Sequence, residues 1–391
     1  VSERCRWTDM APILEPDQRK RFGKVGCGKN EQIARRLWWL ADPFWSLPGN
    51  DRQSEHFARY TMAKILEPAR NAYNLSWSND MREMIVRYGW AKYWTRGPGT
   101  FYEPQAGAVS GHEASPNYHF VPVSLNLDTI PNVSFNLDLD ASAERYAPVV
   151  AKLVFEIEPQ VAVFRRGDSA LVVAAYDVRD HADLDSTNVS ASLVIAHDDS
   201  SLAHVTSVAG LKGAMSIIVE PRPQLMSVEI VNPDTRRGAA WNREGLMIAP
   251  NVPGSVSMSD PFLFEPSEIE VSDLDGAMKT ALGETSVARG KLGIYWETYG
   301  LARTDSAQEV ALTLTRVQEG TLRRIGEAIG LATRASPLTI RWNQMMSVGS
   351  MTARSVVLDL SLIPKGRYML TIETGPDGKE LATSSRLIRI R

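Results

Sequence analysis

The sequence lacks most of the short motifs that mark catalytic and haem sites. Cysteine occurs only at Cys5 and Cys27, and the C-x-x-C and C-x-x-C-H spacings of redox and c-type haem sites do not occur. The G-x-S-x-G nucleophile elbow, the H-E-x-x-H zinc motif and the G-x-x-x-x-G-K-[ST] phosphate loop do not occur either. These absences argue against the common motif-defined enzyme classes and against covalently bound haem.

Long apolar runs and a strong charge imbalance are missing as well. The longest apolar run is far shorter than the ~18–20 residues that cross a bilayer, so we expect no membrane span. The net charge is −3, and the first 100 residues are the more basic part. That region could meet an acidic partner or an anionic lipid surface, but solvated helix faces explain it better. No basic stripe or motif typical of nucleic-acid binding occurs, so we predict no nucleic-acid partner.

The two cysteines leave two interpretations open. A disulfide between Cys5 and Cys27 would close a loop of about 20 residues and stabilise the fold by roughly 3 kcal/mol in the chain-entropy model. Two unrelated thiols are the alternative. The chain begins at Val1, which we interpret as the loss of an upstream export signal. An oxidising compartment fits a disulfide, so we predict a periplasmic or extracytoplasmic location.

The distribution of tryptophan and the hydrophobic period predict three domains. Seven of the ten tryptophans fall within the first 94 residues, and helical patterns dominate there. We predict a helix that starts at Asn30 as N-cap and stops before Pro43, and a second helix capped by Asn50. Phe57, Thr61 and Ile65 would share one face of the second helix. A helical, tryptophan-rich domain is therefore expected over residues 1–145.

From about residue 146 the pattern changes to alternating apolar and polar residues, rich in β-branched side chains. Segments of this kind, separated by Pro, Gly and Asp, are typical of short antiparallel strands. They predict an immunoglobulin-like β-sandwich over residues 146–252 and a second sandwich over 253–391. The expected fold class is thus α+β and multidomain.

Aromatic residues near the N-terminus are candidates for a binding surface. Trp, Tyr and Arg dominate the hot spots of protein interfaces. We select residues of these types, and one phenylalanine, as interface candidates: Trp38, Trp39, Trp45, Trp90, Trp94, Arg96, Phe101 and Tyr102. A small core that relies on large aromatic side chains is the alternative interpretation.

A long irregular segment over residues 96–122 offers a second candidate site. His112, Glu113 and His119 in this segment carry groups that bind metals or transfer protons. Their spacing fits no regular element, so hydrogen-bonded or surface histidines explain them better. We therefore predict no metal, no cofactor and no catalytic residues.

Three stretches resemble the GWxTD domain, a family of mostly exported bacterial proteins: WWLADPFWSLPGNDRQSEHFARYTMAKIL, SWSND and REMIVRYGW. The positions that match are Asp42-Pro43, Glu55, Arg59, Trp77, Asp80 and Arg87-Tyr88-Gly89. Ser76 and Asn79 replace the glycine and threonine of the naming motif. The resemblance implies an architecture and no catalytic residues.

The segment around the naming motif has its own local prediction. We expect residues 76–80 to form a polar turn with the Trp77 ring packed on the preceding helix. Met84, Val86 and Tyr88 would then alternate with Ile85 and Arg87 along a short strand that ends at Gly89.

The three-part build also resembles extrinsic polypeptides that hold a bacterial photosynthetic reaction centre within its light-harvesting ring. We predict a non-enzymatic, membrane-extrinsic scaffold subunit that docks on an integral-membrane protein complex, with such a reaction centre as one host. One alternative is an exported hydrolase with its site in the 96–122 segment. Another is a carbohydrate- or peptide-binding module.

Overall fold

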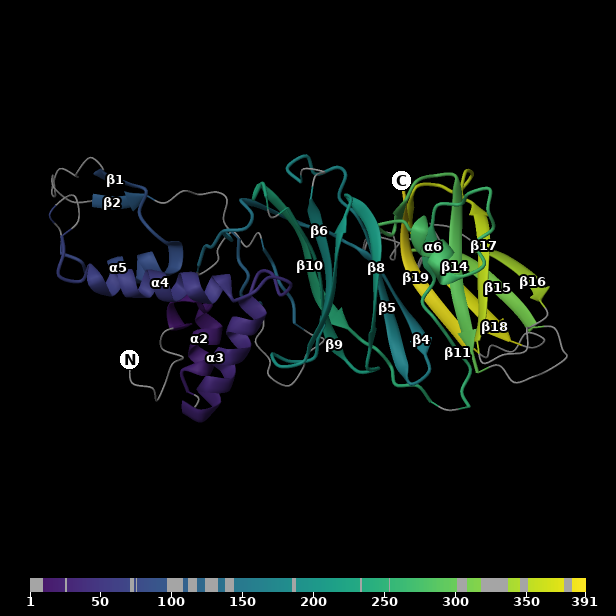
Figure 1. Cartoon of the computed structure of the whole chain (residues 1–391), viewed down its shortest axis with the longest axis horizontal. Helices are drawn as coiled ribbons and strands as arrows, with labels where there is room; N and C mark the ends of the chain where they lie inside the picture. The colour runs from purple at the N-terminus through teal and green to yellow at the C-terminus, as the bar shows by residue number, and fades with distance from the viewer. Residues whose placement is uncertain are drawn as a thin grey trace, which may run out of the picture. The chain divides into compact units, whose positions relative to one another are not determined.

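A computed structural model describes residues 10–24, 27–70, 74, 76–96, 108–111, 118–123, 133–137, 144–184, 188–232, 234–252, 254–300, 308–317, 337–344, 351–375 and 382–391. The chain is mainly β-sheet with a small helical part near the N-terminus (Figure 1). None of the described helices is long and apolar enough to span a bilayer. Residues Val1–Glu156, Asp183–Val208 and Pro223–Met247 form a first compact unit, and Ile157–Ala182, Ala209–Arg222 and Ile248–Arg391 form a second. The domain boundaries near residues 145 and 252 stay a prediction.

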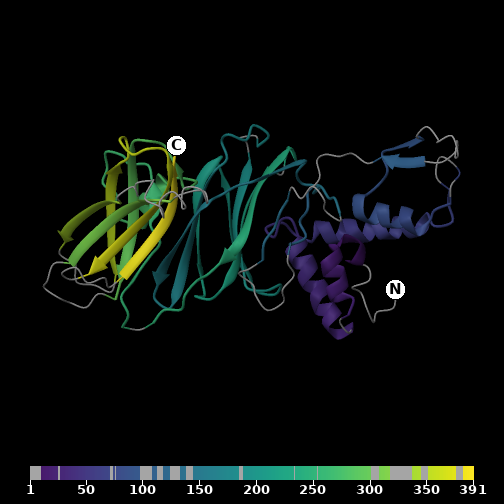
Figure 2. The ribbon, with the colours of Figure 1, turned by 180° about the vertical axis from the view of Figure 1, so that it is seen from behind.

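Helices and one hairpin occupy the N-terminal part of the first unit. They are η1 (Ala11–Ile13), α2 (Pro16–Phe22), α3 (Cys27–Ala41), α4 (Asp51–Ile65), α5 (Asn79–Tyr88), β1 (Tyr93–Arg96) and β2 (Ala108–Gly111). Figures 1 and 2 both show α3 running away from α4 at a steep angle. The predicted cap of α4 is confirmed, because the Asn50 side chain accepts a hydrogen bond from the Gln53 backbone N–H. The predicted start of α3 is wrong, since the helix begins at Cys27 and contains Asn30.

Residues 79–88 form a helix, and the strand predicted there is wrong. Helical spacing puts Ile85 and Val86 together against Ala63 of α4, while Glu83 and Arg87 pair one turn apart. The alternation of Met84, Val86 and Tyr88 is too short to decide between the two periods. The predicted role of Gly89 holds, because the residue ends the helix with φ +83°, a conformation that favours glycine. Trp77 packs on this small cluster with a partly buried ring.

A five-stranded sheet forms the rest of the first unit. Its strand order is β3 (Leu153–Glu156), β10 (Gly238–Leu246), β9 (Gln224–Val231), β6 (Val189–Ala196) and β7 (Leu202–Ala209). β3 runs parallel to β10, and β9 is antiparallel to both of its neighbours. Leu37, Leu40 and Trp39 of α3 share a core with Val194 of β6 and Leu225 of β9. The helices are therefore packed on this sheet through a continuous apolar cluster.

Three sheets and a short helix form the second unit. The first has the strand order β4 (Gln160–Arg166), β5 (Ser169–Asp177), β8 (Lys212–Val219), and α6 spans Leu274–Lys279. In the next sheet β14 (Lys291–Tyr299) pairs with β11 (Ser257–Met258), β12 (Phe262–Phe264) and β17 (Met351–Asp359). The last has the order β13 (Ser286–Val287), β19 (Ala382–Ile390), β18 (Gly366–Gly375), β15 (Gln308–Arg316), β16 (Leu338–Gln344). Side chains of the last two sheets, such as Trp296 and Ile372, meet in one core.

Candidate functional site

The tryptophans of the N-terminal part divide into a buried and an accessible group. Trp38, Trp39 and Trp45 are buried, so the core interpretation holds for these three interface candidates. The rings of Trp39 and Trp45 stack with centroids 5.1 Å apart, and the Trp45 indole N–H donates to the Trp39 carbonyl oxygen (2.8 Å). Trp90 is 46% exposed, and Trp94 is half-buried with its ring 6.2 Å from that of Trp77. Of the five tryptophans selected as interface candidates, Trp90 and Trp94 are accessible for binding.

Several predicted positions lie outside the described residues. They are Cys5, Phe101, Tyr102, His112 and Glu113, together with the side chains of Cys27 and Arg96. The disulfide therefore stays a prediction. The described His, Cys, Asp and Glu residues form no group of three that could hold a metal ion.

His119 lies in a buried ionic cluster in the interior of the first unit. Its Nδ1 is 3.4 Å from the Glu144 carboxylate, which also forms an ion pair with the fully buried Arg52 of α4. Burial, followed by the charge of Arg52, lowers the pKa of His119 to about 4, so the imidazole is neutral at physiological pH. The buried ion pair of Arg52 and Glu144 connects α4 to the segment around Glu144, and the neutral imidazole lies beside it.

A second buried ion pair attaches the turn after α3 to the sheet. The Glu229 carboxylate of β9 accepts hydrogen bonds from the backbone N–H groups of Trp45 (3.0 Å) and Ser46 (2.9 Å). The Arg243 guanidinium of β10 donates to the same carboxylate (3.2 Å). Both ionic side chains are fully buried. Charges buried in this way are retained only when they are paired and hydrogen-bonded, as these are.

Arg243 also satisfies the carbonyl groups at the end of α3. Its Nη1 donates to the carbonyl oxygens of Leu40 (2.9 Å) and Asp42 (2.8 Å). These carbonyl oxygens have no hydrogen-bond donor within the helix because they lie at its C-terminus. The helix dipole also favours a cation at this end. The backbone from Leu40 to Ser46 is therefore held at both ends by one ion pair.

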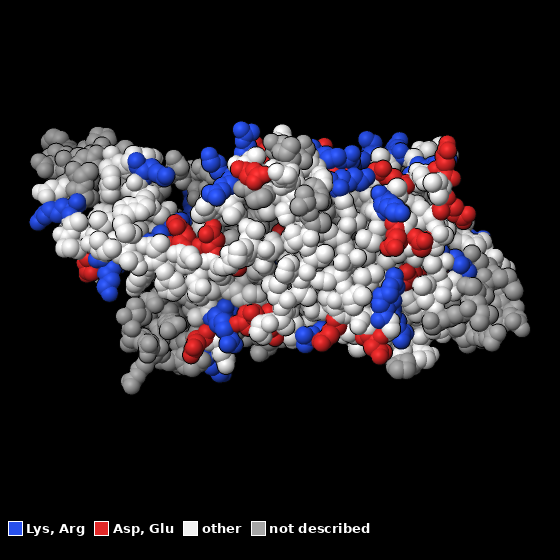
Figure 3. All heavy atoms as spheres, viewed as in Figure 1, with Lys and Arg blue, Asp and Glu red and all other residues white. Residues whose placement is uncertain are grey.

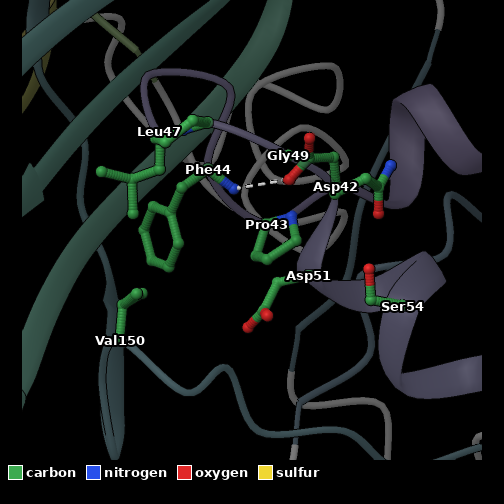
Figure 4. A pocket seen from close by; sticks show the side chains of 10 residues that line it. Asp42, Pro43, Phe44, Leu47, Gly49, Asp51, Ser54 and Val150 are labelled. Carbon is green, nitrogen blue, oxygen red and sulfur yellow. Dashed lines mark hydrogen bonds between the residues drawn. The ribbon is translucent and has the colours of Figure 1, made fainter. Parts of the chain in front are cut away.

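This immobilised turn forms one wall of a pocket of about 160 Å³ (Figure 4). Figure 4 shows Phe44, Leu47 and Val150 on one side, and Asp51 and Ser54 of the first turn of α4 on the other. Asp42 lines the pocket too, and its carboxylate accepts a hydrogen bond from the Phe44 backbone N–H (3.3 Å). The pocket thus combines an apolar wall with two carboxylates.

The two carboxylates of the pocket differ in their surroundings. Asp42 is only 9% exposed, and burial raises its pKa to about 7, with Arg243 opposing this effect and Glu229 adding to it. Asp51 accepts hydrogen bonds from the Tyr146 hydroxyl (2.8 Å) and the Val149 backbone N–H (3.1 Å). A cation in the pocket would favour the ionised form of Asp42. An ammonium or guanidinium group on an aliphatic stem matches this combination of acidic and apolar groups.

Sequence reasoning missed the residues that build the site: Arg52, Glu144, Glu229 and Arg243. A signal was present for Glu229, which stands between Val228 and Ile230 in a strand with every residue buried. A charged residue within a continuous apolar strand indicates a buried partner. The identity of that partner depends on the pairing of β9 with β10 and could not be read from the sequence.

No protein-family model matches the chain, and no curated protein matches it. Solved structures resemble parts of it. An immunoglobulin-like protein from Pseudomonas aeruginosa is 15% identical with a TM-score of 0.21, and the match covers 36% of this chain and 100% of that one. Red sea bream transglutaminase is 8% identical with a TM-score of 0.19, over 60% of this chain and 31% of that chain.

A tetra-tandem repeat from the extending region of a large adhesion protein is 11% identical with a TM-score of 0.18, over 60% of this chain and 49% of that chain. The chain therefore spans less than two thirds of the transglutaminase and of the adhesion repeat. At these identities and TM-scores the likenesses carry no information about function.

Proposed function

We propose that this chain is a non-enzymatic, membrane-extrinsic scaffold subunit that docks on an integral-membrane complex at the extracytoplasmic face. The host we propose is a bacterial photosynthetic reaction centre with its light-harvesting ring. The proposed architecture is a GWxTD-like helical domain followed by two immunoglobulin-like sandwiches.

The observation that carries the proposal is the acidic pocket beside Asp42 and Asp51. The buried pair of Arg243 and Glu229 holds one of its walls, so this part of the pocket is formed before a partner arrives. Pre-formed walls lower the entropy cost of binding. A Lys or Arg side chain of the host would enter the pocket, place its charge beside the two carboxylates and bury its stem against Phe44.

The first test is extraction of the native membrane with a mild detergent, followed by a native gel and mass spectrometry of the proteins that migrate with this chain. Comigration with an integral-membrane complex and its pigment absorption supports the proposal. Migration of the chain by itself contradicts it.

Variants of the pocket make the test specific. Asp42→Asn and Asp51→Asn each remove a negative charge and keep an acceptor oxygen for the hydrogen bonds described above. We expect the double variant to weaken host binding by at least tenfold, since truncating one side of a buried charge pair typically costs ~2–5 kcal/mol. Asp17→Asn, an exposed change in α2 of the same unit, is the matched control. Equal host binding by the unchanged protein, the double variant and the Asp17→Asn control would place the docking surface elsewhere.

A second candidate is a carbohydrate- or peptide-binding module, which the exposure of Trp90 and Tyr93 supports. A glycan and peptide array tests this function, with Trp90→Ala as the variant that should lose any signal. The hydrolase alternative stays a prediction. Loss of a detectable hydrolytic activity on substitution of His112, Glu113 and His119 would support it.

A further inference from the structure

Strand β16 forms an open edge of the five-stranded sheet in the second unit. Among the described strands it pairs with β15 alone, at the end of the strand order (Figure 1). Its residues Leu338–Gln344 therefore carry backbone N–H and C=O groups along a side that has no described strand beside it. An edge of this kind is a template for pairing with another strand unless the protein protects it.

Other sheet edges of the second unit are protected. On the free side of β4, the Asp260 carboxylate accepts a hydrogen bond from the Val163 backbone N–H (2.9 Å). β13 is only two residues long. β17 carries a charge on its core-facing side, because Arg354 lies opposite the buried Trp296. Capped, short and inwardly charged edges resist pairing with a foreign strand, whereas β16 is seven residues long and has no charge on its core-facing side.

The core-facing side of β16 is apolar and partly exposed. Ile340 lies opposite the buried Leu312 of β15. Leu338 lies opposite the buried Leu314. Both of these β16 side chains are 44% exposed, and Trp342 continues the same row with a half-buried ring. The apolar core between the last two sheets therefore reaches the open edge.

The other face of β16 is polar. Thr339 lies opposite Thr313, and the two hydroxyl groups share a hydrogen bond (3.1 Å). Arg341 is the one charged residue of β16, and it forms an ion pair with Glu309 of β15. Figure 3 shows basic and acidic side chains interspersed over the visible face of this unit. We therefore expect the fit of one strand against another, and not long-range charge, to select a partner for β16.

We propose that β16 pairs antiparallel with β16 of a second copy of this chain, so that two copies share one continuous sheet. An antiparallel pair of identical strands is self-complementary about a two-fold axis. Registers that set a core-facing residue opposite an outward-facing one would place the two apolar rows on opposite faces of the joined sheet. The remaining registers each place one residue of β16 opposite itself on the axis.

The register centred on Ile340 satisfies both faces of the strand. Ile340 then lies opposite itself, and Leu338 lies opposite Trp342 of the second copy, so all three apolar side chains of each strand are paired. On the polar face, Arg341 lies opposite Thr339 of the second copy. The register centred on Arg341 would set two arginines directly opposite each other, which is unfavourable. Centres elsewhere leave at least one of the three apolar side chains without an apolar partner within β16.

The contact between the two copies is small, since each copy supplies one strand and three apolar side chains. Interfaces that bury less than about 1,200 Å² are typical of weak, transient complexes. We therefore expect a dimer in equilibrium with the monomer, with a dimer fraction that rises with protein concentration. The inference goes beyond the proposed function and does not rest on it, because no host takes part.

Sedimentation velocity of the purified full-length chain over a range of concentrations tests the inference. Ile340→Lys sets two like charges opposite each other on the axis and removes two apolar side chains from the contact. It should raise the dissociation constant of the dimer at least about tenfold. Val357→Lys is the matched control, because Val357 is an apolar, 51% exposed residue of the edge strand β17. The control should dimerise like the unchanged protein, and circular dichroism should show both variants folded.

Cysteine substitutions test the register with a milder change. In a background that carries Cys5→Ser and Cys27→Ser, Ile340→Cys should form a disulfide-linked dimer on oxidation, because the two cysteines would face each other across the axis. Arg341→Cys is the matched control on the neighbouring residue. It should stay unlinked, since position 341 lies opposite Thr339 of the second copy.

Three outcomes would overturn the inference. The first is a monomer at every concentration. The second is a dimer that Ile340→Lys leaves intact, or that Val357→Lys weakens as much, because the contact would then involve another surface. The third is linking through position 341 in place of 340, which would show a different register. The test uses the purified chain, so failure of the chain to comigrate with a host would refute the scaffold function only.

Discussion

The guanidinium carbon of Arg243 lies 3.7 Å from the centroid of the Trp45 ring, while the same guanidinium forms an ion pair with Glu229. Arg243 belongs to β10 and Trp45 to the turn after α3, so this contact joins the helical part of the first unit to its sheet. A desolvated cation on the face of a tryptophan contributes about 2 kcal/mol. The pocket beside Asp42 depends on this junction for its shape.

Removal of Arg243 should destabilise the protein strongly. Arg243→Met leaves the Glu229 carboxylate buried without its countercharge, which costs ~3–5 kcal/mol. Urea unfolding followed by tryptophan fluorescence measures the change. Glu229→Gln combined with Arg243→Met should cost less than the sum of the two single variants, since no uncompensated charge remains. Additive losses would show that the pair is not coupled.

The protonation of Asp42 should make stability fall as pH rises. Its pKa is about 7 in the folded protein and 3.8 in the unfolded chain, so the folded state binds more protons between these values. Stability from this group is therefore fully present below pH ~4 and is lost by pH ~7, with an upper limit of about 4 kcal/mol. The Asp42→Asn variant should lack this component. Stability curves for the two proteins that stay parallel from pH 4 to 8 would contradict the expected titration.

The buried carboxylate of Glu297 gives a further comparison. Tyr295 donates its hydroxyl hydrogen bond to this carboxylate (2.9 Å), whereas Tyr176 donates to the uncharged Gly210 carbonyl oxygen (3.1 Å). Tyr295→Phe should cost about 1.5–3 kcal/mol, and Tyr176→Phe should cost about 0.5–1.5 kcal/mol. Thermal or urea unfolding checks the order. A larger loss for Tyr176→Phe would be inconsistent with a charged acceptor at Tyr295.

Gly89 should tolerate alanine poorly. Its φ of +83° disfavours any other residue, and an added Cβ would lie 3.3 Å from the Arg59 guanidinium. Gly167 has φ +61° with no atom within 4 Å of an added Cβ, so it serves as the control. We expect a loss of about 1–2 kcal/mol for Gly167→Ala from backbone strain and a larger loss for Gly89→Ala. Equal losses would mean that Arg59 moves aside freely.

Local signals along the chain were sufficient for several elements. The cap at Asn50 depends on a side chain and a backbone N–H three residues away, and both are visible in the sequence. The change to an alternating pattern near residue 146 likewise indicated short strands, because one buried face requires a period of two. The helix at 79–88 was missed because the alternation of Met84, Val86 and Tyr88 covers only a few residues, too few to decide between the two periods.

The composition, the strand-rich second half and the α4 cap follow from the order of residues, since they depend on contacts between neighbours in the chain. The burial of Trp45 and the pocket beside Asp42 do not. They depend on Arg243 and Glu229, which lie about 200 residues further along and meet the turn only when β9 and β10 pair beneath it. The sequence indicates that Glu229 has a buried partner, but only the pairing of β9 with β10 decides that this partner is Arg243, because a buried charge is stable only where folding supplies its partner.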